Sequence, residues 1–389
     1  MICPVVFLFL VTILEVKGDC SGGNCQKISL DVYQDAVQDS EFVGHVFHNS
    51  VTLNPIQCYM KCMQDCRCLS LNYKETNDQK YCELNEGSHF TNKSSLKHSP
   101  GSRYYILRRD YGAEKHDGIA SCVGGETCIN GCCRKNPCLN GGTCNEICEP
   151  TSVRYNCSCP EPFIGKHCEI QPRSCQDYKA AGVDKSGLYK IIDNTNQTLQ
   201  VFCDFNSEPG FAWNLIESFS LSNKHLFQSD VVFYNYLDSS AVSSDSPNWQ
   251  AYLIRRDYLV WLRDHSTHWR ATCRFNTDGT VYTDYARASF EDFDIVRVTP
   301  TAASSCQKYE LVNIRGNECV KCTAATWYLK GAYPLHIDSS YPHGCDFDGN
   351  QSGDVVGSED NFGFYQAVNS KFRCTSSSEA TTQFWFGSK

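Results

Sequence analysis

The middle of the chain contains the stretch Cys133-Arg-Lys-Asn-Pro-Cys138-Leu-Asn-Gly-Gly-Thr-Cys144, followed by Tyr155-Asn-Cys157-Ser-Cys159-Pro and Gly165-Lys-His-Cys168-Glu. The glycines suit tight turns, because glycine adopts backbone conformations that other residues avoid. Cys157 and Cys159 are separated by one residue, so one short strand directs two cross-links in opposite directions. A segment this small holds together only if it is cross-linked.

The first eighteen residues indicate export from the cell. Val5–Leu14 is an almost unbroken apolar run of about ten residues, whereas a membrane-spanning helix needs about twenty. This length suits a secretory signal peptide. We therefore expect residues 1–18 to be removed after Gly18, with a buried N-terminal strand as the alternative. No later stretch of the sequence is long and apolar enough to cross a membrane, so we expect a secreted, extracellular protein.

Cysteine is the most informative residue type in the composition. The chain has 26 cysteines in 389 residues, and 25 remain once Cys3 leaves with the signal. At this density, behind a signal peptide, cysteines are expected to form disulfides. The odd number indicates either a disulfide to another chain, and hence a linked oligomer, or a single unpaired thiol. The net charge of −9 and the lack of basic runs argue against nucleic acid as a partner.

The cysteine spacing divides the chain into a signal peptide and three modules, at residues 1–18, 19–110, 122–170 and 173–389. In the first module Cys58, Cys62 and Cys66 are four residues apart, which would place them on one face of a helix. Asn54 and Pro55 supply an N-cap and a first-turn proline for it. The segments 68–73 and 81–84 are strand-like. The pattern predicts a helix cross-linked to a small sheet.

The third module begins with a strand pattern. Leu199, Val201 and Cys203 alternate with more polar neighbours, and the polar residues 193–198 precede them as a turn. The rest of this module is strand-prone and aromatic. We expect one β-rich globular domain, in which three further disulfides are available to Cys273, Cys306, Cys319, Cys322, Cys345 and Cys374.

Residues 40–108 resemble the PAN/apple domain. The resemblance rests on Cys58-x3-Cys62, Cys68-Leu-Ser-Leu-Asn-Tyr, Cys82-Glu-Leu-Asn and Tyr104-Tyr-Ile. It implies an α+β module that binds proteins or sugars, with the disulfides Cys58–Cys82 and Cys62–Cys68. It leaves Cys20, Cys25 and Cys66 without assigned partners.

The central module resembles an EGF-like domain, on the cysteine and glycine pattern quoted first. The resemblance implies the disulfides Cys133–Cys144, Cys138–Cys157 and Cys159–Cys168 in a small β module. Four cysteines are additional to this pattern, and we expect two local disulfides among them: Cys122, Cys128, Cys132 and Cys148. A rigid spacer is the expected role of this module, and partner binding is the alternative.

Residues 174–216 resemble the start of a fibrinogen C-terminal-like domain. The resemblance rests on Ser174-Cys175-Gln-Asp-Tyr, Ser186-Gly-Leu-Tyr-Lys-Ile-Ile and Val201-Phe-Cys203-Asp-Phe, and it implies a Cys175–Cys203 disulfide. Phe211-Ala-Trp213 replaces the family's usual Gly-Gly-Trp, and the later calcium loop and ligand pocket are not recognisable. The fold class expected is therefore multi-domain, β-rich and disulfide-stapled, with a divergent, mainly-β fibrinogen-like third module.

One loop has the spacing of calcium ligands. Its oxygen-bearing side chains occupy the positions of an EF-hand loop: Asp348, Asn350, Ser352, Asp354 and Glu359. The helices that flank an EF-hand are not predicted here, and Asn350 also begins a glycosylation sequon. Ca²⁺ binding in the third module is thus one expectation, and a solvated loop is the alternative. No other cofactor is expected.

Four sequons mark possible N-glycosylation sites, at Asn92, Asn156, Asn196 and Asn350. We find none of the motifs His-Glu-x-x-His, Gly-x-Ser-x-Gly or a phosphate loop, so no catalytic residue is predicted and the chain is not expected to be an enzyme. His265 and His268 are read as a surface or core pair rather than as metal ligands. The third module's tryptophans are read as core residues, with a glycan-binding platform as the alternative.

The combination of modules points to binding outside the cell. We expect an extracellular matrix or adhesion protein that binds proteins or glycans through its PAN-like and fibrinogen-like modules. A soluble lectin-like defence protein that recognises microbial glycans is the alternative. The architecture resembles that of invertebrate extracellular matrix proteins, including those in the organic matrix of coral skeletons, which implies a mineral-associated matrix as one setting.

Overall fold

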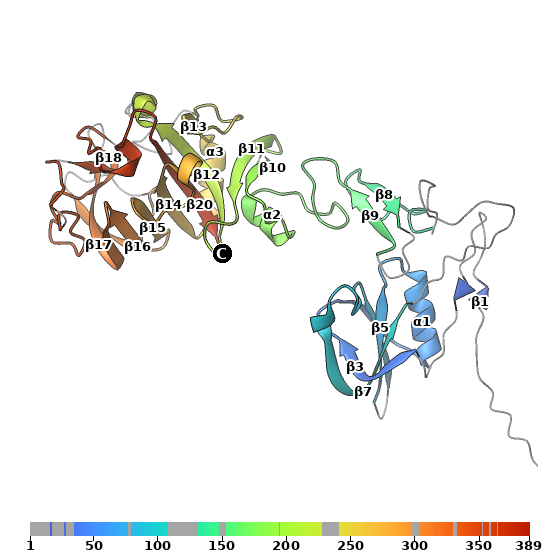
Figure 1. Ribbon diagram of the computed structural model, residues 1–389. Coiled ribbons are helices and arrows are strands. Elements are labelled where there is room, and N and C mark those ends of the chain that lie inside the picture. Colours follow the sequence, from blue (N-terminus) through green and yellow to red (C-terminus); the bar gives the residue numbers. More distant parts are fainter. Residues whose placement is uncertain are drawn as a thin grey trace, which may run out of the picture. The chain divides into compact units, whose positions relative to one another are not determined.

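The protein folds as two compact units in the computed structural model (Figure 1). Unit 1 takes residues 1–160 and 166–169, and unit 2 takes residues 161–165 and 170–389. The structure describes residues 16–17, 27–28, 35–76, 79–107, 131–147, 153–193, 195–227, 241–297, 304–329, 333–351, 353–357, 359–363 and 365–389. The predicted signal peptide lies outside these residues except for β1 (Val16–Lys17), which pairs with β2 (Lys27–Ile28).

The larger part of unit 1 is an antiparallel sheet in the order β3-β7-β5-β6-β4. Its strands are β3 (Ala36–Phe42), β4 (Val46–Val51), β5 (Ser70–Glu75), β6 (Lys80–Asn85) and β7 (Leu96–Ile106). A single 3-10 turn, η1 (Lys93–Ser95), leads into β7. The middle strand β5 is buried over its first four residues, and the core of unit 1 gathers on it.

Helix α1 (Pro55–Gln64) lies beside this sheet (Figure 1) and is cross-linked to it, as the sequence predicts. The Asn54 side chain accepts a hydrogen bond from the Gln57 N–H at 2.9 Å, which satisfies a donor that the first turn leaves unpaired. The buried face of α1 carries Cys58 and Cys62, which form disulfides with Cys82 and Cys68. These are the pairs that the PAN resemblance implied.

The helix ends earlier than the four-residue cysteine spacing suggested. Its last residue is Gln64, and Asp65 after it is extended, with φ −100° and ψ 116°. Asp65 accepts hydrogen bonds from the N–H of Arg67 at 3.0 Å, so a local turn replaces the next helical turn. The prediction that Cys66 shares the helix face of Cys58 and Cys62 is therefore wrong.

A second described part of unit 1 contains a small hairpin, β8 (Thr143–Glu146) and β9 (Tyr155–Ser158). The three disulfides implied by the EGF resemblance are present: Cys133–Cys144, Cys138–Cys157 and Cys159–Cys168. Gly142 is required at its position, because a Cβ atom there would lie 2.6 Å from the sulfur of Cys168. The cysteines are thus packed too closely for a larger residue.

Unit 2 is built on one eleven-stranded sheet in the order β10-β11-β12-β20-β14-β15-β16-β17-β18-β19, with β13 beside β12 (Figure 1). The strands are β10 (Gly187–Ile192), β11 (Thr198–Asp204), β12 (Ala212–Ser220), β13 (Ala251–Leu253), β14 (His268–Cys273), β15 (Tyr285–Ser289), β16 (Ser305–Ile314), β17 (Asn317–Leu329), β18 (Tyr333–Asp338), β19 (Asp360–Asn361) and β20 (Thr381–Ser388). The helical segments are α2 (Cys175–Ala180), η2 (Leu221–Leu226), α3 (Arg256–Asp264), α4 (Phe275–Asp278) and η3 (Arg373–Thr375). Strand β20 lies between β12 and β14, so residues 381–388 complete the centre of the sheet.

The core of unit 2 is aromatic. Trp213, Trp269 and Trp385 are at most 1% exposed, so the reading of Trp269 and Trp385 as core residues is confirmed. Four disulfides cross-link the unit: Cys175–Cys203, Cys273–Cys374, Cys306–Cys345 and Cys319–Cys322. The first is the pair that the fibrinogen-like resemblance implied, and the others use the six cysteines for which three disulfides were expected.

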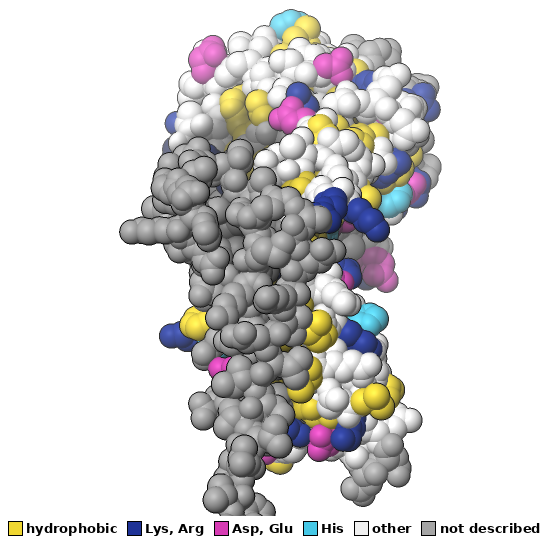
Figure 2. Space-filling model, turned by 90° about the vertical axis from the view of Figure 1, so that its right-hand side faces the viewer, with side chains coloured by type: hydrophobic (Ala, Val, Ile, Leu, Met, Phe, Trp, Pro, Cys, Tyr) yellow, Lys and Arg dark blue, Asp and Glu magenta, His cyan; other side chains and the backbone are white. Residues whose placement is uncertain are grey.

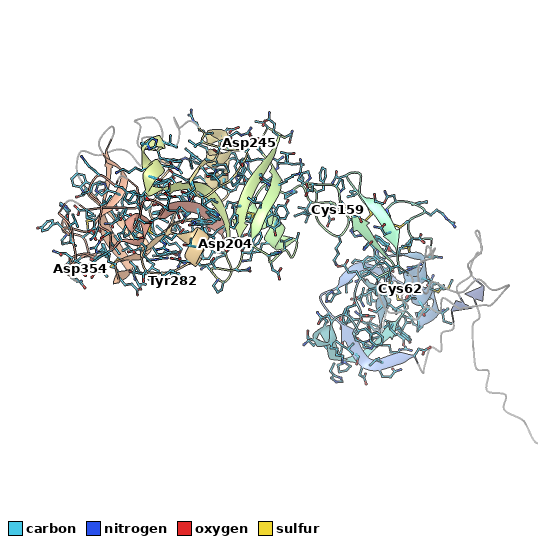
Figure 3. All side chains as sticks on the ribbon, turned by 45° about the horizontal axis from the view of Figure 1, so that its top comes forward. Cys62, Cys159, Asp204, Asp245, Tyr282 and Asp354 are labelled. Atoms are coloured by element: carbon cyan, nitrogen blue, oxygen red, sulfur yellow. A yellow bond between two sulfur atoms is a disulfide. The ribbon has the colours of Figure 1, made fainter. Side chains whose placement is uncertain are left out.

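A buried ion network crosses the sheet of unit 2. Arg270 on β14 is fully buried, and its guanidinium lies 2.6 Å from the carboxylate of Asp204 and 3.0 Å from that of Glu208. The same guanidinium lies 4.7 Å from the ring centroids of Trp213 and Trp385, a distance at which a cation is attracted to an aromatic face. Figure 3 marks Asp204. The network thus places one buried cation between two nearly buried carboxylates in unit 2.

Unit 2 is expected to lose stability in acid as Asp204 becomes protonated. Burial works to raise the pKa of Asp204, but Arg270 and hydrogen bonds outweigh it and hold the pKa below its ordinary value of 3.8. The carboxylate therefore stabilises the fold fully above about pH 5, and this contribution is lost as the pH falls through the lowered pKa. Urea unfolding followed by tryptophan fluorescence between pH 6 and pH 2 measures the effect. Asp204→Asn should lose less stability over this range than the wild-type protein, and equal losses would contradict the assignment.

Candidate binding site

A groove of about 970 Å³ lies in unit 1, where the EGF-like hairpin meets the region around the end of α1. From residues 35–107, the PAN-like module, it is lined by His48, Lys61, Gln64, Asp65, Cys66, Arg67 and Leu84. From residues 131–169, the EGF-like module, it is lined by Gly131, Cys132, Arg134, Lys135, Pro137, Leu139, Tyr155, His167 and Glu169. We call it the inter-module groove.

A disulfide between Cys66 and Cys132 forms part of the groove wall. Because α1 ends at Gln64, Cys66 lies in the turn beyond the helix, where Cys132 reaches it with the two Cα atoms 5.7 Å apart. The prediction that Cys132 forms a local disulfide within its own module is wrong. The two modules are covalently joined, and apart from residues 161–165 the EGF-like module belongs to unit 1.

Two further contacts hold the modules together beside this disulfide. The guanidinium of Arg154 donates to the carbonyl of Met63 at 3.0 Å. Lys166 forms an ion pair with Glu86 at 2.9 Å. Arg154 is only 6% exposed, so its contact is shielded from water and favours a fixed arrangement of the two modules.

The groove has more cationic than anionic side chains. Lys61, Arg67, Arg134 and Lys135 line it, against the two carboxylates of Asp65 and Glu169. The whole chain carries a net charge of −9, whereas the side chains that line the groove carry a local excess of positive charge. On the described part of the face drawn in Figure 2, Lys and Arg side chains are interspersed with Asp and Glu.

The cations of the groove differ in whether a carboxylate pairs with them. Arg67 binds Asp65 through two hydrogen bonds, at 3.0 and 2.7 Å. Burial works to raise the pKa of Asp65, but Arg67 outweighs it and keeps the pKa below its usual value. Lys61 contacts the hydroxyl of Ser50 at 3.0 Å and a backbone carbonyl. Neither Lys61 nor the exposed Lys135 has a carboxylate partner among the residues that the structure describes, so both are available to an anion.

The rest of the groove offers an aromatic hydroxyl and apolar surface. The hydroxyl of Tyr155 and Nε2 of His167 lie 2.6 Å apart, and burial raises the pKa of Tyr155. Leu139 is 53% exposed at the rim. Such a surface can hold anionic groups with ammonium donors and cover part of the ligand with apolar side chains.

The structure describes four of the five predicted calcium ligands and shows the partners of three of them. Asp348 accepts a hydrogen bond from the N–H of Asn350 at 2.9 Å, and Asp354, marked in Figure 3, pairs with Lys371. Glu359 is buried and pairs with the buried Arg315, a partner that a buried guanidinium requires. Ser352 lies outside the described residues. Within the described part of the chain no group of three or more His, Cys, Asp or Glu side chains could hold a metal.

The remaining predicted residues are the sequon asparagines, the two histidines and the cysteines without assigned partners. Asn156, Asn196 and Asn350 are exposed, and Asn92 is half-buried. The ring of His265 stacks on Trp261, while His268 binds Glu310 at 3.2 Å, so the two histidines serve separate contacts. Five cysteines predicted to be in the mature chain lie outside the described residues: Cys20, Cys25, Cys122, Cys128 and Cys148. Every cysteine that the structure describes is in a disulfide.

The sequence does not predict the cationic groove, because its cations come from distant parts of the chain. One signal could have found them. Cys66 was left over in the first module, and Cys132 was additional to the EGF pattern. A disulfide between two such leftover cysteines would have placed their neighbours Arg67 and Arg134 together.

Comparison with known proteins identifies the two modules of unit 1. Residues 25–108 match the PAN domain family, and residues 133–167 match the EGF-like domain family. Human protein jagged-1 is 45% identical over 47 residues, which are 12% of this chain and 4% of jagged-1. Mouse delta-like protein 3 is 45% identical over 47 residues, 12% of this chain and 7% of that protein. A cubilin homolog of Caenorhabditis elegans is 36% identical over 74 residues, 19% of this chain and 2% of that protein.

These matches support an extracellular binding role at a general level. The chain spans less than a tenth of the length of the relatives it matches, so their activities do not transfer to it as a whole. PAN and EGF-like domains are typical of extracellular adhesion or binding proteins. The helices that the structure describes are all too short or too polar to cross a membrane. The many disulfides are consistent with a secreted protein.

Proposed function

We propose that this protein is an extracellular matrix or adhesion protein that acts by binding rather than by catalysis, and that it holds an anionic partner in the inter-module groove. The observation that carries the proposal is the excess of Lys and Arg side chains in a groove whose two walls are joined by a disulfide. A fixed groove loses less entropy on binding than a flexible pair of domains would.

A linear polyanion is the ligand that this surface favours. The cations are contributed by both modules, and the groove includes exposed side chains on each side. A sulfated polysaccharide carries repeated anionic groups along a chain and could contact both walls at once. Such binding would weaken steeply with added salt, because bound counterions are released when the charges pair.

Replacing both Lys61 and Lys135 with glutamine should weaken binding of the full secreted chain to heparin about thirtyfold. Each lysine near an anionic surface contributes about 1 kcal/mol, and about 1.4 kcal/mol corresponds to a factor of ten. Heparin-affinity chromatography with a salt gradient and titration calorimetry measure the loss. Neither lysine has a carboxylate partner among the described residues, and Lys61 loses only its contacts with Ser50 and Val51, so the melting temperature should stay close to that of the wild-type protein.

The matched control removes the same charge elsewhere in unit 1. Lys93 and Lys97 are exposed and do not line the groove, so Lys93→Gln with Lys97→Gln should leave the affinity within about twofold. Equal losses in the two double variants would show that binding is non-specific. If the wild-type protein passes through the heparin column at low salt, the proposal is wrong for sulfated polysaccharides.

Several finer features belong to the same proposal. A mineralised or skeletal matrix is one setting for such a protein, and glycans on the four sequon asparagines would suit it. If residues 1–18 are removed with Cys3, an odd number of cysteines remains, and all twenty in the described residues are paired. The unpaired one then falls among the five outside them, which supports a disulfide-linked oligomer; sizing with and without reductant tests it.

We also propose that unit 2 is a divergent fibrinogen C-terminal-like domain. The support is local. Ser174 and Asp177 form a reciprocal cap on α2, the β10–β11 hairpin has the expected alternation, and Cys175 pairs with Cys203.

A further inference from the structure

Unit 2 holds a group of aromatic rings at its surface. Trp327 lies on β17, and Tyr341 and His343 lie on the loop that follows β18. The ring centroids of Tyr341 and His343 are 4.9 Å apart, and those of Trp327 and His343 are 5.8 Å apart, each pair nearly perpendicular. Tyr341 is 63% exposed, in contrast to the buried tryptophans of the core. We call these three residues the aromatic cluster.

The carboxylate of Asp338 organises the aromatic cluster. One oxygen accepts from the hydroxyl and the N–H of Ser340, at 2.6 and 2.8 Å, and from the N–H of Tyr341. The other lies 2.8 Å from Nε2 of His343 and 3.4 Å from the indole nitrogen of Trp327. A single side chain therefore orients both the strand residue and the loop residues of the cluster.

The loop that carries Tyr341 and His343 is also held at its C-terminal end, by a disulfide and by hydrogen bonds. Cys345 is joined to Cys306 on β16 by a disulfide. Asp346 accepts from the N–H and the hydroxyl of Thr323 on β17, at 2.9 and 2.8 Å. Between these anchors His343 has a φ of +49°, a conformation that costs energy for any residue but glycine and persists only where the surroundings impose it.

Exposed rings on a loop held at both ends contribute little to folding. Tyr341 keeps most of its surface in water, so its burial does not stabilise the core. Holding an apolar ring exposed in a fixed orientation is instead what a binding site requires, because a ligand that covers the ring then loses little further entropy.

We propose that the aromatic cluster binds the ring of a neutral hexopyranose. The C–H face of a pyranose is apolar and packs against aromatic faces, while its hydroxyls need nearby hydrogen-bonding groups. His343 and Ser340 supply such groups beside the rings. The carboxylates of Asp338 and Asp346 lie beside the same loop and would repel an anionic sugar, so this ligand differs in class from the polyanion proposed for unit 1.

The test uses the full secreted chain and a panel of neutral oligosaccharides built from glucose, galactose, mannose and N-acetylglucosamine, first on an array and then by titration calorimetry. Tyr341→Ala should weaken binding of the best oligosaccharide roughly tenfold or more, as is usual for an aromatic anchor. His343→Ala should weaken it as well. Unchanged circular dichroism and melting temperature show that these variants are folded.

Two controls separate this site from other causes. Tyr282, marked in Figure 3, is a 43% exposed tyrosine of the same unit outside the cluster, and Tyr282→Ala should bind as the wild-type protein does. The Lys61→Gln, Lys135→Gln variant should also bind neutral sugars normally. The proposal is overturned if no neutral oligosaccharide binds, if only acidic sugars bind, or if Tyr341→Ala retains full affinity; binding of a protein partner by the cluster in the absence of sugar binding would likewise overturn it.

Discussion

Replacing Arg270 with methionine is expected to lower the free energy of unfolding of unit 2 by about 3–5 kcal/mol. The guanidinium is fully buried and pairs with the nearly buried carboxylates of Asp204 and Glu208. Methionine has a similar length but no charge, so Asp204 would lose the guanidinium that pairs with it, while Glu208 would keep its ion pair with Arg287 at 2.7 Å. Breaking a buried ion pair from one side costs far more than the intact pair contributes, because the remaining charges stay desolvated.

Tryptophan fluorescence during urea unfolding reports this effect selectively, because all six tryptophans of the chain lie in unit 2. Arg297→Met is the matched control. Arg297 pairs with Asp264 at 2.8 Å, but the two side chains are 46% and 41% exposed. An exposed pair of this kind contributes about 1 kcal/mol or less. Equal losses in the two variants would show that the buried network is not a centre of stability.

The second large effect concerns the disulfide between Cys273 and Cys374, which are separated by 101 residues. Replacing both with alanine should destabilise unit 2 by about 4–5 kcal/mol, because the cross-link limits the unfolded chain more as the loop it closes grows. Cys273 ends β14, and Cys374 lies in η3, shortly before β20. The disulfide therefore also holds in place the segment that leads into the central strand of the sheet.

Unit 2 contains its own control for loop length. Cys319 and Cys322 are separated by three residues, and replacing both with alanine should cost only about 1–2 kcal/mol on the same argument. The same fluorescence measurement compares the two double variants. A larger loss from the short-range pair than from the long-range pair would refute the chain-entropy explanation.

The parts of the fold that depend on short spacings could be predicted from the sequence. Asn54 and Pro55 indicated the start of α1, and the alternation through Val201 and Cys203 indicated β11. The disulfides implied by the two family resemblances of unit 1 join cysteines at most 24 residues apart. In these segments local geometry decides the structure, so a pattern of nearby residues is sufficient evidence.

The parts that depend on long-range pairing could not be predicted. No local pattern places β20 between β12 and β14 or brings Arg270 to Asp204, because those contacts join residues 66 or more positions apart. The calcium pattern shows the same limit of local spacing. The spacing shows where oxygen-bearing side chains occur along the chain. It does not show that Arg315, 44 positions away in the sequence, forms an ion pair with Glu359.

The binding site also combines features that the sequence predicts with features that depend on long-range pairing. Each wall of the inter-module groove lies in a module that the sequence identified, but the groove exists only because the two walls meet. The residues that bring them together, Cys66 and Cys132, were the ones that no family pattern paired. The account of this protein as a binding protein with a fixed basic groove depends on that disulfide.

Disulfide mapping of the secreted full-length protein tests the groove most directly. Proteolysis without reduction, followed by mass spectrometry with partial reduction to resolve neighbouring cysteines, should yield fragments that contain Cys66 linked to Cys132. If Cys66 is instead joined to Cys20 or Cys25, and Cys132 to Cys122, Cys128 or Cys148, the two modules are not covalently joined. That result would contradict the claim of a fixed groove between them.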